Sequence, residues 1–565
     1  MTLRRPHPVL LVAALSLSAC GDDGQTSASD GSSGTSSTGT TEPDPTAAPT
    51  TSTADPGTST TTAPTTTTTE PETSTAQPVT STTGDTTTDT GDTTIDTGDT
   101  TTTTTTGDST STTGDTSSTS TTGAVDDTPP GVVLLRPFDG VHLASRRLVV
   151  TGEASDDIGV IAVDLVLNGG APVSLPIVPG PDASFTADLR LARGWNTVEI
   201  VARDAADNIG SSTRLVHLGV PVAAGGAHSL ALVGGVAWGF GRNNEGQLAA
   251  GDLVDHHDAV ELVDLGDAVS LSANLNHSLA VTADGAVKAW GRNDEEQLGQ
   301  GPGPDLSTPA IVPGVPEVVL VAAGQRHSLA LTDDGHVWSF GADSNGQLGR
   351  DGDAAPAVIP DLEDIVAIAA GGSYSLAVDG AGAVWAWGNG SDGQLGDGMT
   401  VDSPVPKVIS MVDAAAVAAG KAHTLALAPL GSLAACGLDA SGQLGDGMNV
   451  DNELLPVTVA EFADVLTVAA SGNLSLALAG DAALWAWGQN FNGQLGLGDA
   501  LDRSEPTAVP GLPPVHAIAA GLAHTVVLDA DGGVWAWGLN SFGQLGKGDA
   551  GNGTHSAVPL LVALP

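Results

Sequence analysis

The chain has 565 residues, and its 66 Asp and Glu against 18 Lys and Arg give a formal net charge of −48. Proteins that bind nucleic acid through its phosphates need a basic stripe, and residues 219–565 contain no run of Lys or Arg. We therefore expect no nucleic acid partner, and the acidic balance is typical of a protein kept soluble by its charge.

The first twenty residues have the features of an export signal. Arg4 and Arg5 precede an apolar stretch from Val9 to Ala19, which is too short to span a bilayer stably. The sequence Leu-Ser-Ala-Cys ends at Cys20 and resembles the lipobox of bacterial lipoproteins. The resemblance implies a signal peptide at 1–19, acylation of Cys20 and a lipid anchor in the bacterial cell envelope, at the outer membrane or cell surface. An ordinary secretion signal and an uncleaved core helix are the alternatives.

Residues 20–126 are predicted to be the anchor residue and a disordered linker. From 21 to 123 the chain is mostly Thr, Ser, Gly, Asp and Pro, with no Lys or Arg. Such a composition cannot bury a core, so we interpret the segment as a tether that lifts the folded part off the membrane. A low-complexity expansion without a specific role is the alternative.

Residues 127–218 have the pattern of a small all-β domain. Alternating segments such as 147–154, 159–167, 185–191 and 196–205 are separated by turns. Short strands at this spacing over about ninety residues predict an antiparallel sandwich, and the stretch resembles bacterial immunoglobulin-like modules.

Several oxygen ligands occur in the turns of this predicted sandwich. They are Asp156, Asp157, Asp204, Asp207 and Asn208. Because Ca²⁺ prefers oxygen ligands, these residues are weak candidates for a calcium site at one end of the sandwich. Ordinary turn residues in solvated loops are the more common explanation of such a pattern.

Residues 219–565 consist of seven copies of one unit. The turn Gly-Gln-Leu, or Glu-Gln-Leu in the second copy, ends at leucines that are 50, 50, 47, 49, 51 and 50 residues apart: Leu248, Leu298, Leu348, Leu395, Leu444, Leu495 and Leu545. Each unit has an apolar strand, a polar turn, a hairpin and a Pro-containing extended segment, which makes about four strands. Seven such units predict a β-propeller. We expect the first and last strands of the array to pair and close the ring.

This pattern resembles the regulator of chromosome condensation repeat family. The family's blades carry the same small-small-Gly-x-x-His-Ser turn and the same Trp-Gly-x-Asn-x-x-Gly-Gln-Leu-Gly run. The departures look like core substitutions: Tyr374 and Leu474 replace His, and Cys436 replaces Trp. We therefore expect repeat five to be the loosest-packed blade and Cys436 to be a buried, unreactive side chain. Eukaryotic members bind chromatin and exchange nucleotide on a small GTPase, but the uniform spacing leaves no room for a large inserted wedge, so we do not transfer that activity.

The repeated polar residues are interpreted as structural. They are His228, His277, His327, His423 and His524, with Gln247, Gln347, Gln394, Gln443, Gln494 and Gln544. One residue type at the same register in several blades lies at several places around a ring, which does not assemble one active site. The cluster of Asp255, His256, His257 and Asp258 is a weak metal candidate in a loop, and a solvated loop is the alternative.

No catalytic constellation is recognisable in the sequence, and no cofactor is predicted. The loops after each Gln-Leu turn differ between repeats while the strands do not: 249–258, 300–309, 349–356, 397–404, 446–453, 497–505 and 547–556. Variable loops on a constant scaffold favour binding, so the preferred hypothesis is an envelope-anchored, non-enzymatic module that binds a protein or glycan. Exported relatives include a β-lactamase inhibitor, which makes protein recognition plausible by resemblance only. A cell-surface hydrolase or lyase and a structural coat component are the alternatives.

Overall fold

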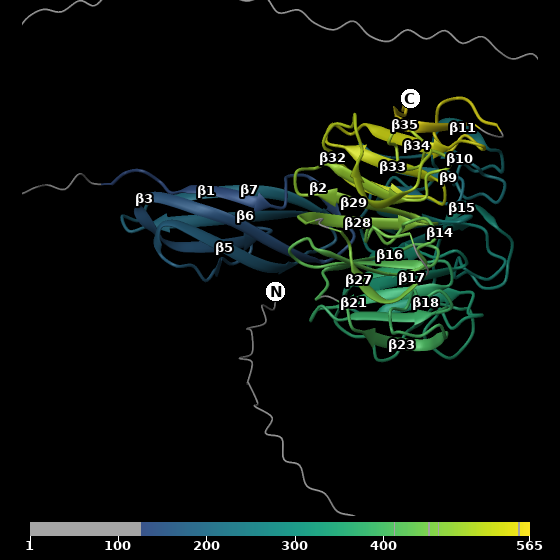
Figure 1. Ribbon diagram of the computed structural model, residues 1–565, viewed down its shortest axis with the longest axis horizontal. Coiled ribbons are helices and arrows are strands. Elements are labelled where there is room, and N and C mark those ends of the chain that lie inside the picture. Colours follow the sequence, from purple (N-terminus) through teal and green to yellow (C-terminus); the bar gives the residue numbers. More distant parts are fainter. Residues whose placement is uncertain (1–125, 412, 450–451, 461–462, 552–553) are drawn as a thin grey trace, which may run out of the picture. The chain divides into compact units, whose positions relative to one another are not determined.

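The computed structural model describes residues 126–565 apart from 412, 450–451, 461–462 and 552–553 (Figure 1). The predicted signal peptide, Cys20 and nearly all of the predicted linker lie outside these residues. The described residues form an all-β fold, as predicted. Among them, no helix has the length and apolar character needed to cross a membrane.

Residues 131–218 form the N-terminal module, whose seven strands belong to one hydrogen-bonded sheet. The strands are β1 (Gly131–Arg136), β2 (Val141–Leu143), β3 (Arg147–Leu167), β4 (Val173–Ser174), β5 (Gly180–Arg190), β6 (Gly194–Asp204) and β7 (Ile209–Leu218). Alternate residues of β5 and β6 are buried, as the two-residue period of a strand requires. Phe185 and Ile200 lie in the resulting core. The immunoglobulin-like character of this module stays a prediction.

Residues 222–561 form seven four-stranded antiparallel sheets, which confirms the predicted seven-bladed propeller. Blades 1 to 3 contain β8 (Val222–Ala224), β9 (His228–Val233), β10 (Val236–Gly241), β11 (His256–Glu261); β12 (Ala268–Asn274), β13 (His277–Thr282), β14 (Val287–Gly291), β15 (Leu306–Ile311); and β16 (Val318–Ala323), β17 (His327–Thr332), β18 (Val337–Gly341), β19 (Ala357–Val358).

Blades 4 to 7 repeat the same arrangement. They contain β20 (Ile365–Ala370), β21 (Tyr374–Asp379), β22 (Val384–Gly388), β23 (Ser403–Ile409); β24 (Ala416–Ala419), β25 (His423–Leu427), β26 (Leu433–Gly437), β27 (Glu453–Thr458); β28 (Val465–Ser471), β29 (Leu474–Ala479), β30 (Leu484–Gly488), β31 (Arg503–Ala508); and β32 (Val515–Ala520), β33 (His524–Asp529), β34 (Val534–Leu539), β35 (His555–Leu561). Strands two and three of each blade are almost wholly buried, and Trp290, Trp387, Trp487 and Trp537 fill the space between blades.

The predicted pairing of the first and last strands is wrong. β8 pairs with β9 and β35 pairs with β34, so each blade is built from four consecutive strands. The array begins with an inner strand and ends with an outer one, and these lie at opposite edges of their sheets. Blades 1 and 7 nevertheless lie side by side, with β8 packed against β32 and β33 (Figure 1). The ring is therefore closed by packing and by side-chain hydrogen bonds.

Candidate functional site

The antiparallel order of the strands gives the propeller two distinct faces. The starts of the inner strands and the turns between strands two and three lie on one face, which we call the covered face. The turns between strands one and two, the Gly-Gln-Leu turns and the variable loops lie on the other, which we call the free face. All direct contacts described below between the N-terminal module and the propeller turns are made on the covered face.

Five arginines of the N-terminal module contact the covered face. Arg146 donates to the carbonyl oxygen of Asp333 (2.7 Å) and to its carboxylate (2.8 Å), and its side chain is only 7% exposed. Arg193 donates to the carbonyl oxygens of Ala283 (3.2 Å) and Val318 (2.8 Å). These two side chains therefore reach blades 2 and 3, and the module and propeller pack into one compact unit.

The other three arginines form ion pairs with aspartates at one repeated position of the propeller. Arg190 pairs with Asp364 at 2.5 Å and Arg147 pairs with Asp413 at 2.8 Å. Arg136 pairs with Asp464 at 3.1 Å, and its second nitrogen donates to the carbonyl oxygen of the next residue at 2.7 Å. Each of these aspartates lies ten residues before the first residue of the second strand in blades 4, 5 and 6. The three arginines therefore contact the same position in three successive blades.

A segment of the module also closes one end of the central channel. Ser145 forms an antiparallel bridge with Ala367 of β20, and its hydroxyl donates to the carbonyl oxygen of Ala415 at 2.6 Å. The backbone N–H of Arg146 donates to the carbonyl oxygen of Val366 at 2.9 Å. His142 lies at the end of the channel. The module therefore covers this end of the channel, and the other end lies toward the free face.

The repeated histidines form a belt that links neighbouring blades. In each case Nε2 lies 2.9 to 3.1 Å from the hydroxyl of the next blade: His228 to Ser278, His277 to Ser328, His327 to Ser375, His423 to Ser475 and His524 to Ser229. The last pair joins blade 7 to blade 1. The belt thus supplies the ring closure that strand pairing does not.

The hydroxyls of the belt determine the histidine tautomer. Each hydroxyl donates its hydrogen to the carbonyl oxygen of a Gln-Leu turn at 2.8 to 2.9 Å, as Ser278 does to Gln247 and Ser475 does to Gln443. Because a hydroxyl has one hydrogen, it accepts from the histidine, which must carry its proton on Nε2. Burial lowers the pKa of His228, His277 and His423 to about 3 and that of His327 and His524 to about 4.

The glutamines of the repeat organise the turn from which this carbonyl points. The side-chain oxygen of Gln247 accepts the backbone N–H of Glu245 at 2.9 Å, and the same contact recurs in the equivalent glutamines Gln297, Gln347, Gln394, Gln443, Gln494 and Gln544. The carbonyl oxygen of Gln247 also accepts from the indole of Trp290. The histidines and glutamines therefore occupy one interior network, which gives them no free surface for catalysis.

The two departures from histidine have different consequences. Tyr374 donates to the carbonyl oxygen of His423 and so keeps a polar link between blades 4 and 5. Leu474 is fully buried and supplies no side-chain hydrogen bond to blade 7. Cys436 is also fully buried, and burial raises the pKa of its thiol to about 12. A loosest-packed repeat five stays a prediction.

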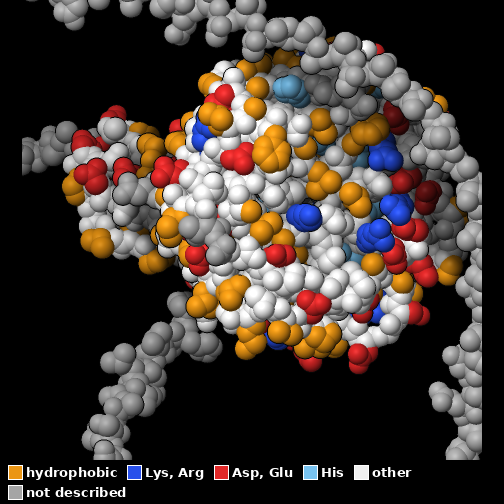
Figure 2. Space-filling model, turned by 45° about the vertical axis from the view of Figure 1, so that its right-hand side comes forward, with side chains coloured by type: hydrophobic (Ala, Val, Ile, Leu, Met, Phe, Trp, Pro, Cys, Tyr) orange, Lys and Arg blue, Asp and Glu red, His pale blue; other side chains and the backbone are white. Residues whose placement is uncertain are grey.

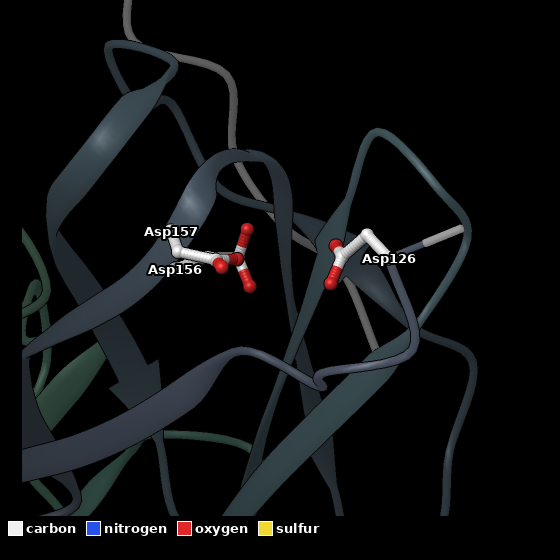
Figure 3. A group of neighbouring side chains, drawn as sticks. All are labelled: Asp126, Asp156 and Asp157. Atoms are coloured by element: carbon white, nitrogen blue, oxygen red, sulfur yellow. The ribbon is translucent and has the colours of Figure 1, made fainter. Parts of the chain in front are cut away.

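The calcium candidates of the N-terminal module fall into two groups. Asp156 and Asp157 in β3 face Asp126, which precedes β1, and ligand atoms of the three carboxylates lie within 4.8 Å of one another (Figure 3). Sequence reasoning missed Asp126 because it lies at the edge of the low-complexity segment. The backbone N–H groups of residues 158 and 159 already donate to Asp156. Exposed acidic groups at a turn often lie this close without a metal.

The remaining candidates have structural partners. Asp204 is fully buried and accepts the backbone N–H and the side-chain amide of Asn208 at 2.9 and 2.8 Å. Burial works against its ionisation, but these hydrogen bonds bring the net pKa of Asp204 below the usual value. Asp207 pairs with Arg203 at 3.1 Å. These contacts show that Asp204, Asp207 and Asn208 stabilise a turn.

The loop cluster after blade 1 does not converge on one point. The carboxylate of Asp255 accepts the backbone N–H of Asn243, whereas His256 contacts Asp252 at 3.1 Å. His257 packs against the glycine turn of blade 7 at Gly543. Within the described residues, this cluster brings no three ligand atoms together in the manner of a metal site.

The free face carries exposed apolar side chains on the variable loops of blades 4, 5 and 6 and on the turn before Gly-Gln-Leu in blade 6. They are Met399, Val401, Met448, Phe491 and Leu501, each more than half exposed. We call this set the apolar arc. Figure 2 shows hydrophobic side chains along the lower edge of the propeller, where blade 4 lies in Figure 1, and mixed acidic and basic side chains farther round. Exposed apolar loops on a rigid scaffold are typical of interaction surfaces.

Comparison with known proteins places the repeats in a family. The model of the RCC1-like domain matches residues 302–564, and that of the regulator of chromosome condensation (RCC1) repeat matches residues 268–297. The propeller is built from RCC1-like repeats. No curated protein matches the chain.

Solved structures support the assignment of this RCC1-like propeller. Prp20p from Saccharomyces cerevisiae, described with its binding to Gsp1p and histones, is 25% identical over 57% of this chain and 85% of its own, with a TM-score of 0.52. Human WBSCR16 is 25% identical over 58% of this chain and 94% of its own, with a TM-score of 0.53. A yeast RCC1 chain bound to Kap60 is 23% identical over 61% and 84%, also with a TM-score of 0.53, and shows likeness of fold alone.

Proposed function

We propose that this protein is a non-catalytic binding module that holds a protein partner on the free face of its propeller. The observation that carries the proposal is the difference between the two faces. The N-terminal module occupies the covered face through Arg136, Arg146, Arg147, Arg190 and Arg193. Among the described residues, the module leaves the free face open, and that face carries the variable loops.

A protein is a better match to this face than a glycan. The apolar arc consists mainly of aliphatic side chains, and Phe491 is its single aromatic member. Protein interfaces bury such side chains at their centre, whereas flat aromatic surfaces suit sugar rings. The similar propeller of Prp20p is described with protein partners, which supports the same class of ligand here.

The export signal supports a location in the cell envelope. Arg4, Arg5 and the sequence ending at Cys20 resemble a lipoprotein signal, and the acidic, Thr-rich residues 21–123 fit a tether. A Cys20→Ser variant should move from the membrane fraction to the soluble fraction and lose its acyl chains by mass spectrometry. An unchanged distribution would exclude lipid anchoring through this residue.

The binding function is tested by affinity capture from envelope extracts. The bait is the full chain with Cys20→Ser, compared with Phe491→Asp and Met399→Asp on the free face. Val178→Asp, at a residue 83% exposed in the N-terminal module, is the matched control. A partner held by the bait and the control but lost by both free-face variants supports the proposal. Equal capture by all four proteins, or capture by none, contradicts it.

A further inference from the structure

The inner strands of the propeller present backbone edges to the central channel. β8, β12, β16, β20, β24, β28 and β32 each stand last in their sheets, so one edge of each has no neighbouring strand within its blade. The cavity between them has a volume of 170 Å³. Such edges bind extended backbone when side chains leave room for it.

The side chains around this cavity are unusually small. In five blades the last two lining residues are both alanine: Ala223 and Ala224, Ala322 and Ala323, Ala369 and Ala370, Ala418 and Ala419, Ala519 and Ala520. In blade 2 they are Ala273 and Asn274, and in blade 6 they are Ala470 and Ser471. Methyl groups occupy little of the space between the inner strands. The channel therefore remains a cavity and is not filled by side chains.

One inner edge already binds an extended segment of this chain. Ser145 and Arg146 bond to Ala367, Val366 and Ala415 at the covered end of the channel. This contact is a short β-addition, made by one backbone β-bridge, one backbone hydrogen bond and the hydroxyl of Ser145. It shows that the inner edges accept a strand-like segment without disruption of their own blades.

Hydrogen bonds between blades border the free-face end of the channel. The backbone N–H of Gly372 donates to the carbonyl oxygen of Lys421, whose own N–H donates to the carbonyl oxygen of Gly472. His142 of the N-terminal module lines the covered end of the cavity. A rigid rim limits the entropy lost on binding.

We propose that the channel is a peptide site, which receives a short extended segment of a protein partner from the free face by β-addition to the inner strands. The inference rests on the proposed function and specifies how the partner is held. Small residues are preferred in the inserted segment, because the alanine walls leave no space for large ones. The variable loops would then contact the rest of the partner.

The test uses random linear twelve-residue peptides displayed on phage, with the full chain carrying Cys20→Ser as the target. Enriched peptides should bind Ala273→Phe and Ala470→Phe at least about tenfold more weakly, a change of about 1.4 kcal/mol. Both alanines are partly exposed and line the cavity, on blades 2 and 6. Val408→Phe, at an exposed position of β23, is the matched control and should bind as the parent does. Thermal unfolding checks that each variant folds.

A second measurement does not depend on filling the channel. Because Cys436 is fully buried, Ala470→Cys provides the accessible thiol in the Cys20→Ser background. Maleimide should label it rapidly, and an enriched peptide should slow this labelling but not that of Val408→Cys. Absence of enrichment, equal binding to the filled variants, or labelling unaffected by peptide would each overturn the inference. None of these results would alter the effect of Phe491→Asp and Met399→Asp on partner capture, which tests the proposed function.

Discussion

The two faces of the propeller differ in how regular their surface residues are from blade to blade. The covered face presents an aspartate at the same register in blades 4, 5 and 6, and the arginines of the N-terminal module match that period. The free face presents loops that differ from blade to blade and carry the apolar arc. Regular features of a repeat thus serve an internal partner, whereas irregular ones are available to an external partner.

Acid should weaken the molecule most, because it acts on the histidine belt at the free-face end of the blades. The unfolded pKa of histidine is about 6.5 and the folded values are about 3 to 4, so the unfolded state binds more protons between these limits. Stability should therefore be complete above about pH 6.5 and fall as the pH drops toward about 3, by about 1.4 kcal/mol per pH unit for each buried histidine.

Chemical denaturation at a series of pH values measures this slope. His423→Gln should reduce the slope of stability against pH by the contribution of one histidine, because the belt loses one titrating group. Val408→Gln, at an exposed position without a titrating group, is the control and should leave the slope unchanged. An identical slope in both variants would show that the belt does not govern the acid response.

Removal of one arginine from the covered face should have the next largest effect. Arg146→Met keeps most of the apolar stem but removes the hydrogen bonds to Asp333 and Leu191. Since the Arg146 side chain is 7% exposed, we expect a loss of about 2 to 3 kcal/mol in the free energy of unfolding. Arg203→Met breaks an ion pair whose members are 42% and 80% exposed and should cost less than about 1 kcal/mol. An equal loss of stability in the two variants would contradict a specific contribution of Arg146 to the contact between the module and the covered face.

Substitution on the free face should leave stability nearly unchanged. Phe491 is 64% exposed, so Phe491→Asp should alter the free energy of unfolding by less than about 0.5 kcal/mol while it weakens partner capture. Thermal unfolding and capture measured on one preparation separate the two effects. A large loss of stability would mean that the loop supports the blade and would remove the contrast between the faces.

The smallest effect concerns the blade interior between the faces. With its pKa raised to about 12 and its side chain buried, Cys436 should react with maleimide at pH 8 far more slowly than in the unfolded chain. Labelling as fast as that of the unfolded chain would show that blade 5 opens readily. Such a result would support the prediction that the cysteine leaves this blade loosely packed.

Sequence reasoning identified the propeller because its signal is local and repeated. The Gln-Leu turns and the alternating strands recur at a constant period, and each blade folds from its own repeat. Ring closure was predicted wrongly, since it depends on whether the array starts with an inner or an outer strand, which the period alone does not reveal. The belt hydroxyls such as Ser278 and Ser475 are present in the repeat, but their interblade partners require the packed structure.

The covered face could not be predicted from the repeat alone. Arg136, Arg146 and Arg190 lie in the N-terminal module, and their partners are more than 170 residues away in the chain. The available signal was the concentration of arginine in that module within a very acidic chain, beside acids spaced at the repeat period. Only the docked geometry shows that these charges face one another.

The contiguous blades have a consequence for how the chain can change length. Because every blade is made from one uninterrupted repeat, duplication or deletion of about fifty residues in the gene would add or remove a whole blade without splitting another. A circular permutation with new ends between two blades would also leave all seven sheets intact. In a ring closed by strand exchange, one blade would depend on both chain ends; here, the hydrogen bond between Ser229 and His524 joins two complete blades.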